Sequence, residues 1–180
     1  MSYMDDVKEQ FLHFKKSLCI YWATYGGFKS LIASPYLFIA LLISMACAPY
    51  WASERVNTWH ALSLLTLPNL LGFTLGGYAM LIAFGDEKFR NLISGSTKGK
   101  ISPFMALNGA FVHFVIVQVV ALSIALFGSA WSLNTGCIAF IGFTCFVYSL
   151  LTAVAAVLAV LRVAGWFDHW CEKNNSAPKQ

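Results

Sequence analysis

One apolar stretch, residues 61–84, constrains the fold of this chain more than any other feature. It contains no Asp, Glu, Lys, Arg or His, and it ends abruptly at a charged segment, residues 85–90. A helix needs about 20 apolar residues to cross the hydrocarbon core of a bilayer. The stretch is long enough, so we predict that it forms a membrane-spanning helix.

The composition favours a surface that faces lipid. Hydrophobic residues make up 58% of the 180 residues and charged residues 11%, whereas soluble domains carry about 25% charged residues. So few charges favour a membrane protein over a soluble globular domain. The net charge of +4 is spread along the chain and forms no Arg-rich helix, so we expect no nucleic-acid partner.

The apolar pattern predicts an all-α polytopic membrane protein with four transmembrane helices and a preceding amphipathic interfacial helix. The transmembrane domain, residues 31–172, has its spans at about 31–51, 61–84, 103–131 and 136–164. Only the short uncharged segment 132–135 separates the last two spans, which therefore should form an antiparallel hairpin. The polar residues 173–180 are expected to be a disordered cytoplasmic tail.

The N-terminal segment, residues 1–30, is predicted to be a cytoplasmic amphipathic helix that ends at Gly26 and Gly27. Lysines lie on one side of this helix. Apolar side chains at helical spacing share another face: Phe11, Phe14, Leu18, Trp22 and Tyr25. Such a helix either lies in the headgroup layer or packs on a partner subunit or on the cytosolic ends of the bundle. Both alternatives stay open at this point.

The basic residues predict the orientation. Of the 12 Lys and Arg residues, all but Arg55 lie in the N-terminal segment, in the 85–102 connection or at the C-terminal end. Cytoplasmic connections carry the excess of Lys and Arg in membrane proteins. We therefore expect a multi-pass protein of the cell inner membrane, with both termini and the 85–102 loop in the cytoplasm.

The second predicted span carries a small-residue pattern. Asn69, Gly72 and Gly76 recur on one side of the helix, and a GxxxG pair allows two helix backbones to approach closely. The functional interpretation is an oligomer seam or a pore-lining helix, and the alternative is tight packing inside one subunit. Pro68 is either a hinge or a tolerated bend.

Polar residues in the last two spans are the other candidates for a pore or for helix packing. Asn108, His113 and Gln118 lie on the third span but do not form one polar stripe, because His113 points away from the other two. A buried neutral histidine can relay protons or sense pH, or simply bond a neighbouring helix. Tyr148 on the fourth span either lines a wet cavity or bonds a neighbouring helix.

Charged and aromatic residues at the cytoplasmic ends are candidates for docking a partner, and they fall on the second connection and the C-terminal end: Asp86, Glu87, Lys88, Arg90, Trp166 and Asp168. The five cysteines form no CxxC pair, and we predict no metal site and no cofactor. Cys47 and Cys137 fall toward the outer ends of their spans, and whether they pair is left open.

The sequence contains no nucleophile–base pair or phosphate-binding loop, so we predict no catalytic residues and no enzyme. We expect a homo-oligomeric inner-membrane protein that forms or gates a channel or pore for ions or small solutes. The alternative is a membrane anchor or sensor that recruits a cytosolic protein partner, as in antiviral defence, stress or toxin-immunity systems. A third reading, an intramembrane enzyme, depends on His113 alone.

Overall fold

The computed structural model describes residues 3–53, 58–83, 94 and 101–175. These residues form helices and no strand, which confirms the all-α prediction. The elements follow in the order α1 (Tyr3–Tyr25), α2 (Gly27–Ile32), α3 (Pro35–Ala46), the 3-10 helix η1 (Ala48–Tyr50), α4 (Trp59–Ala83), α6 (Pro103–Ala130) and α7 (Gly136–Asn175).

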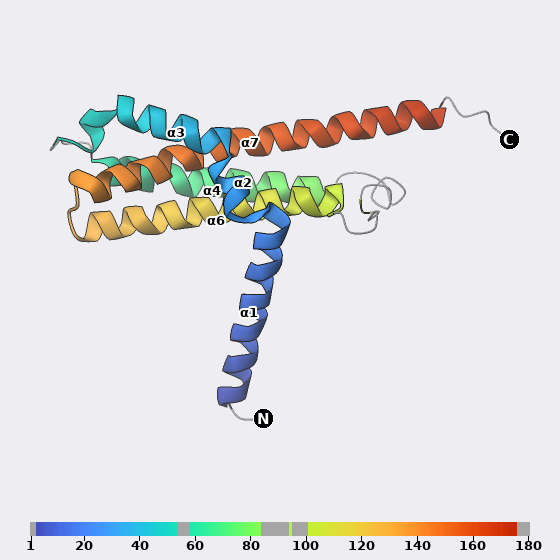
Figure 1. Cartoon of the computed structure of the whole chain (residues 1–180), viewed down its shortest axis with the longest axis horizontal. Helices are drawn as coiled ribbons and strands as arrows, with labels where there is room; N and C mark the ends of the chain where they lie inside the picture. The colour runs from blue at the N-terminus through green and yellow to red at the C-terminus, as the bar shows by residue number, and fades with distance from the viewer. Residues whose placement is uncertain (1–2, 54–57, 84–93, 95–100, 176–180) are drawn as a thin grey trace.

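The elements α4, α6 and α7 run side by side and form the body of the molecule (Figure 1). The shorter α3 packs on the first half of α7. The expected hairpin of α6 and α7 is present, with a tight turn between Ala130 and Gly136. In Figure 1, α1 stands across the axis of the bundle, and α7 continues well past the ends of α4 and α6.

Three of the helices, α4, α6 and α7, are long and apolar enough to cross a membrane. The predicted first span, 31–51, is not one continuous helix but the end of α2, the 12 residues of α3, and η1. Two prolines explain the difference. Pro35 favours an extended residue before it, and Ser34 has φ −69° and ψ 120°, while Pro49 lies in η1 beyond the end of α3.

The boundaries of the other predicted spans agree closely with the helices, except at the end of α7. The helix α4 continues through Pro68, and α6 begins at Pro103 behind Ser102, whose hydroxyl accepts a bond from Met105 N at 3.2 Å. The helix α7 runs to Asn175, beyond the predicted end at 164. It includes the first residues of the predicted tail, while residues 176–180 lie outside the described part.

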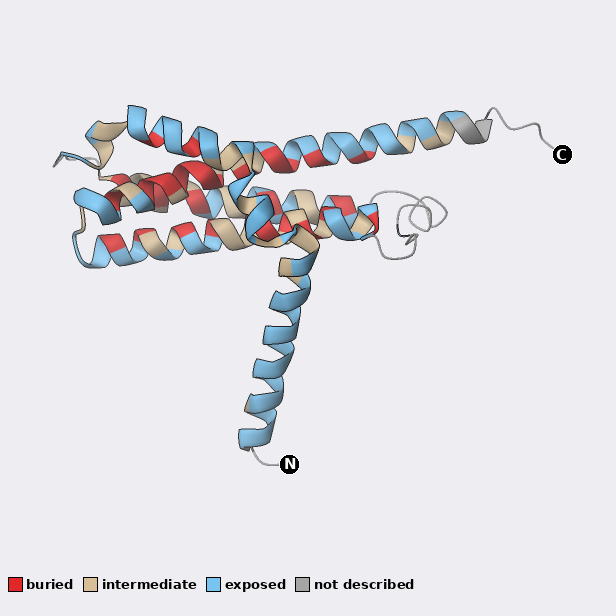
Figure 2. Ribbon diagram, in the orientation of Figure 1, coloured by how far each residue is buried: buried red, intermediate tan, exposed pale blue. Residues whose placement is uncertain are grey.

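The bundle has an apolar core, but it also exposes many large apolar side chains on its outer surface and buries several polar ones. Exposed positions cover the outward sides of the helices, and buried positions lie where the helices face one another (Figure 2). Leu65, Phe73 and Phe127 are exposed, whereas His113 and Gln118 are buried. Polar groups in a membrane span face the protein interior, because lipid cannot hydrogen-bond to them. This distribution agrees with a lipid-facing bundle.

Trp59 occupies the core at one end of the bundle and is 0% exposed. Its indole lies between Gly128 on α6 and Gly142 on α7, where a Cβ would collide with the ring. Its Nε1 donates to the carbonyl oxygen of Leu133 in the α6–α7 turn at 2.8 Å. The side chain of Trp59 on α4 therefore contacts α6, α7 and the turn between them.

The helix α1 ends where the sequence predicts, because Gly26 and Gly27 adopt φ of +98° and +67°. Its last turns pack on α6, and a Cβ on Gly109 would lie 2.7 Å from Thr24 Cγ2. The rest of α1 is exposed on all sides, including the face of Phe11 and Phe14 (Figure 2). Among the described residues, α1 therefore packs on the rest of the chain through its C-terminal end.

Candidate functional site

A buried histidine connects three helices and forms the centre of the candidate site. His113 on α6 is 3% exposed. Its Nδ1 lies 2.8 Å from the hydroxyl of Tyr21 on α1, and its Nε2 lies 3.0 Å from the hydroxyl of Tyr148 on α7. The ring of Tyr25 stacks on the imidazole with centroids 3.7 Å apart. We call these four residues the His113 cluster.

The bonding of the cluster requires no charge. In a neutral imidazole one ring nitrogen donates and the other accepts, so either tautomer satisfies one phenol at each nitrogen. Burial, and then the neighbouring Tyr25, raise the pKa of Tyr21 to about 12, so this phenol remains protonated and available as a donor. The arrangement ties the end of α1 to the interior of the bundle.

The other predicted polar residues of α6 bond to α4 rather than to the His113 cluster. Asn108 Oδ1 accepts a bond from the Tyr78 hydroxyl at 2.7 Å. Gln118 is fully buried, and its Nε2 donates to Thr74 Oγ1 at 2.9 Å. The three polar residues of α6 thus point toward different neighbours, as their spacing predicts, and in one subunit they serve as links between helices.

The predicted small-residue face of α4 is open. A Cβ at Gly72 or Gly76 would meet no atom within 4 Å, and Asn69 is exposed, bonding only within its own helix, to Leu65 O at 3.3 Å. The exposed residues of this stripe, which we call the α4 face, recur at helical spacing: Leu65, Asn69, Gly72, Gly76, Met80 and Ala83. Among the residues that the structure describes, none packs on the glycines of this face.

Only part of the predicted docking surface falls in the described residues. Asp86, Glu87, Lys88 and Arg90 lie outside them. Trp166 and Asp168 are exposed on the distal half of α7. Trp166 lines one cavity together with Tyr25 and Tyr148 of the His113 cluster.

All five cysteines are free thiols, Cys47 and Cys137 included. Within the described ranges, no three His, Cys, Asp or Glu side chains converge in a way that could hold a metal ion.

Several residues of the site were missed by sequence reasoning. Tyr21 and Tyr25 are the most important, and Tyr78 and Thr74 provide the partners on α4. A signal for the first pair was present, because Tyr21 and Tyr25 are four residues apart and share a face of α1. Their partner lies 92 positions away from Tyr21, and no local pattern indicates a contact at that separation.

The fold and the site define a class: an all-helical protein with three helices that are long and apolar enough to cross a membrane, joined by buried polar contacts. No known protein family model, no curated protein and no solved structure matches the chain. The proposals below therefore rest on the geometry.

Proposed function

We propose that this protein is a multi-pass protein of the inner membrane that assembles into a homo-oligomer through the α4 face and forms or gates a path for ions or small solutes. One observation carries the proposal. The polar residues of α6 are bonded within the subunit, while the α4 face, with its GxxxG pair and Asn69, is left open. A path between copies is therefore favoured over one through a single subunit.

The depth of the bundle in the bilayer follows from α1. This helix runs across the bundle axis (Figure 1) and exposes Asp5, Lys8 and Lys15, and such charges are costly in hydrocarbon. The exposed part of α1, which carries these charges, therefore lies in the headgroup layer. The α7 segment from Gly136 to Thr152, near the level where α1 meets the bundle, is about 24 Å long, close to the hydrocarbon thickness of about 30 Å.

The same depth supports a fourth crossing by α3. The helix starts at Pro35, which lines a cavity together with Thr152. Beyond its other end, the carbonyl oxygen of Trp51 accepts a bond from Gly136 N at 3.1 Å. The segment from α3 to Trp51 thus connects the level of α1 with the far end of α7. The N and C termini are then on one side, the cytoplasm, as the Lys and Arg distribution predicts.

Two native cysteines test this orientation, because α7 carries one near each end. With the other cysteines replaced by serine, we expect a membrane-impermeant thiol reagent to label Cys137 on intact cells and to label Cys171 only after the membrane is opened. Cys137 is exposed and Cys171 half-buried, so labelling in detergent provides the control for reactivity. Labelling of Cys171 alone on intact cells would reverse the orientation.

The α4 face predicts a selective effect on assembly. Gly76→Leu should shift the protein from oligomer to monomer by about tenfold or more in dissociation constant, since a bulky side chain keeps two backbones apart. Gly77→Leu is the matched control. A Cβ added at Gly77 would also meet no atom within 4 Å, but Gly77 lies about 100° around the helix from Gly76. Analytical ultracentrifugation in detergent gives both dissociation constants.

The path itself is tested by solute flux in liposomes that contain the purified protein. We expect flux from the wild type and from Gly77→Leu, and loss of flux from Gly76→Leu. A wild-type protein that stays monomeric and gives no flux at any protein-to-lipid ratio would contradict the proposal. A stable oligomer that gives no flux would support the proposed assembly and contradict the proposed path.

The second candidate function is a membrane anchor or sensor that recruits a cytosolic partner. One observation favours it. The helix α7 continues past the ends of α4 and α6 (Figure 1) and exposes Trp166 and Asp168. Loss of cellular function on replacing these two residues, with wild-type oligomer and flux retained, would support the anchor over the path.

A further inference from the structure

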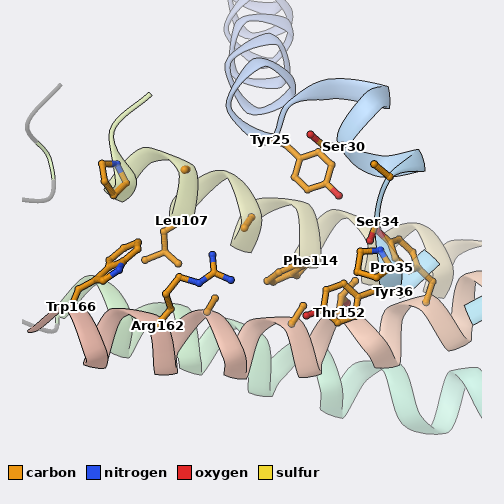
Figure 3. Close-up of a pocket in the computed structure, with 17 residues that line it drawn as sticks. Tyr25, Ser30, Ser34, Pro35, Tyr36, Leu107, Phe114, Thr152, Arg162 and Trp166 are labelled. Atoms are coloured by element: carbon orange, nitrogen blue, oxygen red, sulfur yellow. The ribbon is translucent and has the colours of Figure 1, made fainter. Parts of the chain in front are cut away.

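A cavity of about 380 Å³ lies where the α2–α3 connection meets α6 and α7. In Figure 3, Arg162 and Trp166 lie at one end, and Tyr36 and Thr152 lie at the other. Phe114 lies between the two ends, and Leu107 lies beside Arg162 and Trp166. The volume falls in the range of small-molecule sites.

The described lining of this cavity carries positive charge and no negative charge. Of the described residues that line it, Arg162 is the only one with a formal charge. The guanidinium has no carboxylate partner among the described residues, and the side chain is exposed. A guanidinium binds phosphate through two parallel hydrogen bonds, and a planar fork suits that geometry better than an ammonium.

The wall between α6 and α7 suits an apolar chain, whereas the hydroxyl groups of the lining come from Tyr25, Ser30, Ser34, Tyr36, Tyr148 and Thr152. Four alanines, Ala106 and Ala110 on α6 with Ala155 and Ala159 on α7, leave space between the two helices, and Leu107 and Phe114 complete the apolar wall. A ligand that fits both parts has an anionic head and an apolar tail.

The position of Arg162 indicates where such a ligand comes from. The backbone of Arg162 lies ten residues, or about 15 Å, beyond Thr152 toward the proposed cytoplasmic side, and its guanidinium extends back into the cavity toward Phe114, nearer the level of α1 (Figure 3). The cytoplasmic leaflet carries anionic lipids, and basic pockets between membrane helices on that side bind their headgroups. We propose that this cavity binds an anionic phospholipid, with its phosphate on Arg162 and an acyl chain between α6 and α7. The inference rests on the orientation proposed above but not on the oligomer or the path.

The experiment measures lipid binding by full-length protein in detergent, from the rise of the thermal unfolding midpoint as lipid is added. The probes are dioleoylphosphatidylglycerol and, for comparison, dioleoylphosphatidylcholine and inorganic phosphate. We expect a saturable rise with phosphatidylglycerol only. Arg162→Gln should weaken this binding by about tenfold or more, which is the loss of one charge-assisted bidentate contact, and Arg162→Lys should have an intermediate effect.

Lys29→Gln is the matched control, because Lys29 lies on α2 near the cavity but does not line it. It removes the same charge and should bind phosphatidylglycerol as the wild type does. Equal binding by Arg162→Gln and the wild type would overturn the proposal, as would an equal rise with phosphatidylcholine. A full effect of inorganic phosphate alone would show an anion site without a lipid. Oligomeric state is measured separately, so failure of the lipid site leaves the proposed assembly standing.

Discussion

Replacing Trp59 with alanine is expected to lower the free energy of unfolding by about 3–5 kcal/mol, the range for a fully buried aromatic residue. The indole is 0% exposed and wedged between Gly128 and Gly142. In a lipid-facing bundle, helix association depends on close packing rather than on the hydrophobic effect. The cavity that Trp59→Ala leaves between the helices therefore removes packing contacts that neither water nor lipid replaces. The bond to Leu133 O is lost as well.

A double-mutant cycle of Trp59→Ala with Gly142→Ala isolates the contribution of the contact between the Trp59 ring and Gly142. A Cβ at Gly142 collides with the Trp59 ring, so this substitution alone should cost about 1–3 kcal/mol by overpacking. In the background of Trp59→Ala, the added methyl group occupies the space that the indole has left. The destabilisation of the double mutant should therefore be smaller than the sum of the two single destabilisations. Unfolding in mixed micelles, followed by far-UV circular dichroism, gives the four free energies.

Trp131→Ala is the control for the removal of a tryptophan at the same end of the bundle, because Trp131 is 69% exposed. We expect a change within about 0.5 kcal/mol, as for other exposed substitutions. If Trp59→Ala were no more destabilising than Trp131→Ala, the packing of the Trp59 indole between the helices would have no structural importance.

Replacing His113 with leucine is expected to release the C-terminal end of α1 from the bundle. The substitution removes the bonds to Tyr21 and Tyr148 and the stacking on Tyr25. A buried phenol left without a partner costs about 1–3 kcal/mol, which corresponds to about a tenfold or greater rise in local opening. Hydrogen exchange of the backbone amides of residues 20–25 measures this opening.

The controls separate the histidine from a general loss of stability. His169→Leu changes an exposed histidine on α7 and should leave exchange in α1 unchanged. Tyr21→Phe removes only the bond between α1 and His113, so it should open α1 without loosening α7. Tyr148→Phe removes only the bond between α7 and His113. Wild-type exchange rates in His113→Leu would show that α1 is held by other contacts, such as that of Gly109 with Thr24.

The glycines show what sequence pattern can and cannot predict. The GxxxG pair of Gly72 and Gly76 was the recognisable signal, yet a Cβ at either glycine would meet no other described part of the chain within 4 Å. Gly109, Gly128 and Gly142 carry no such pattern and lie against Thr24 or Trp59. Spacing shows which side of a helix a glycine occupies, but the neighbouring helix decides whether that side is covered.

The sequence by itself determined the helices and most of their ends, because these depend on local chemistry: long apolar runs, prolines at 35 and 103, the glycine pair at 26 and 27, and the uncharged turn before Gly136. It also determined that the polar residues of α6 point in different directions. Only the tertiary structure decided the partners, Tyr21 and Tyr148 for His113 and Thr74 for Gln118. The reason is that contacts between helices depend on their relative rotation and depth, which the packing of the whole bundle sets.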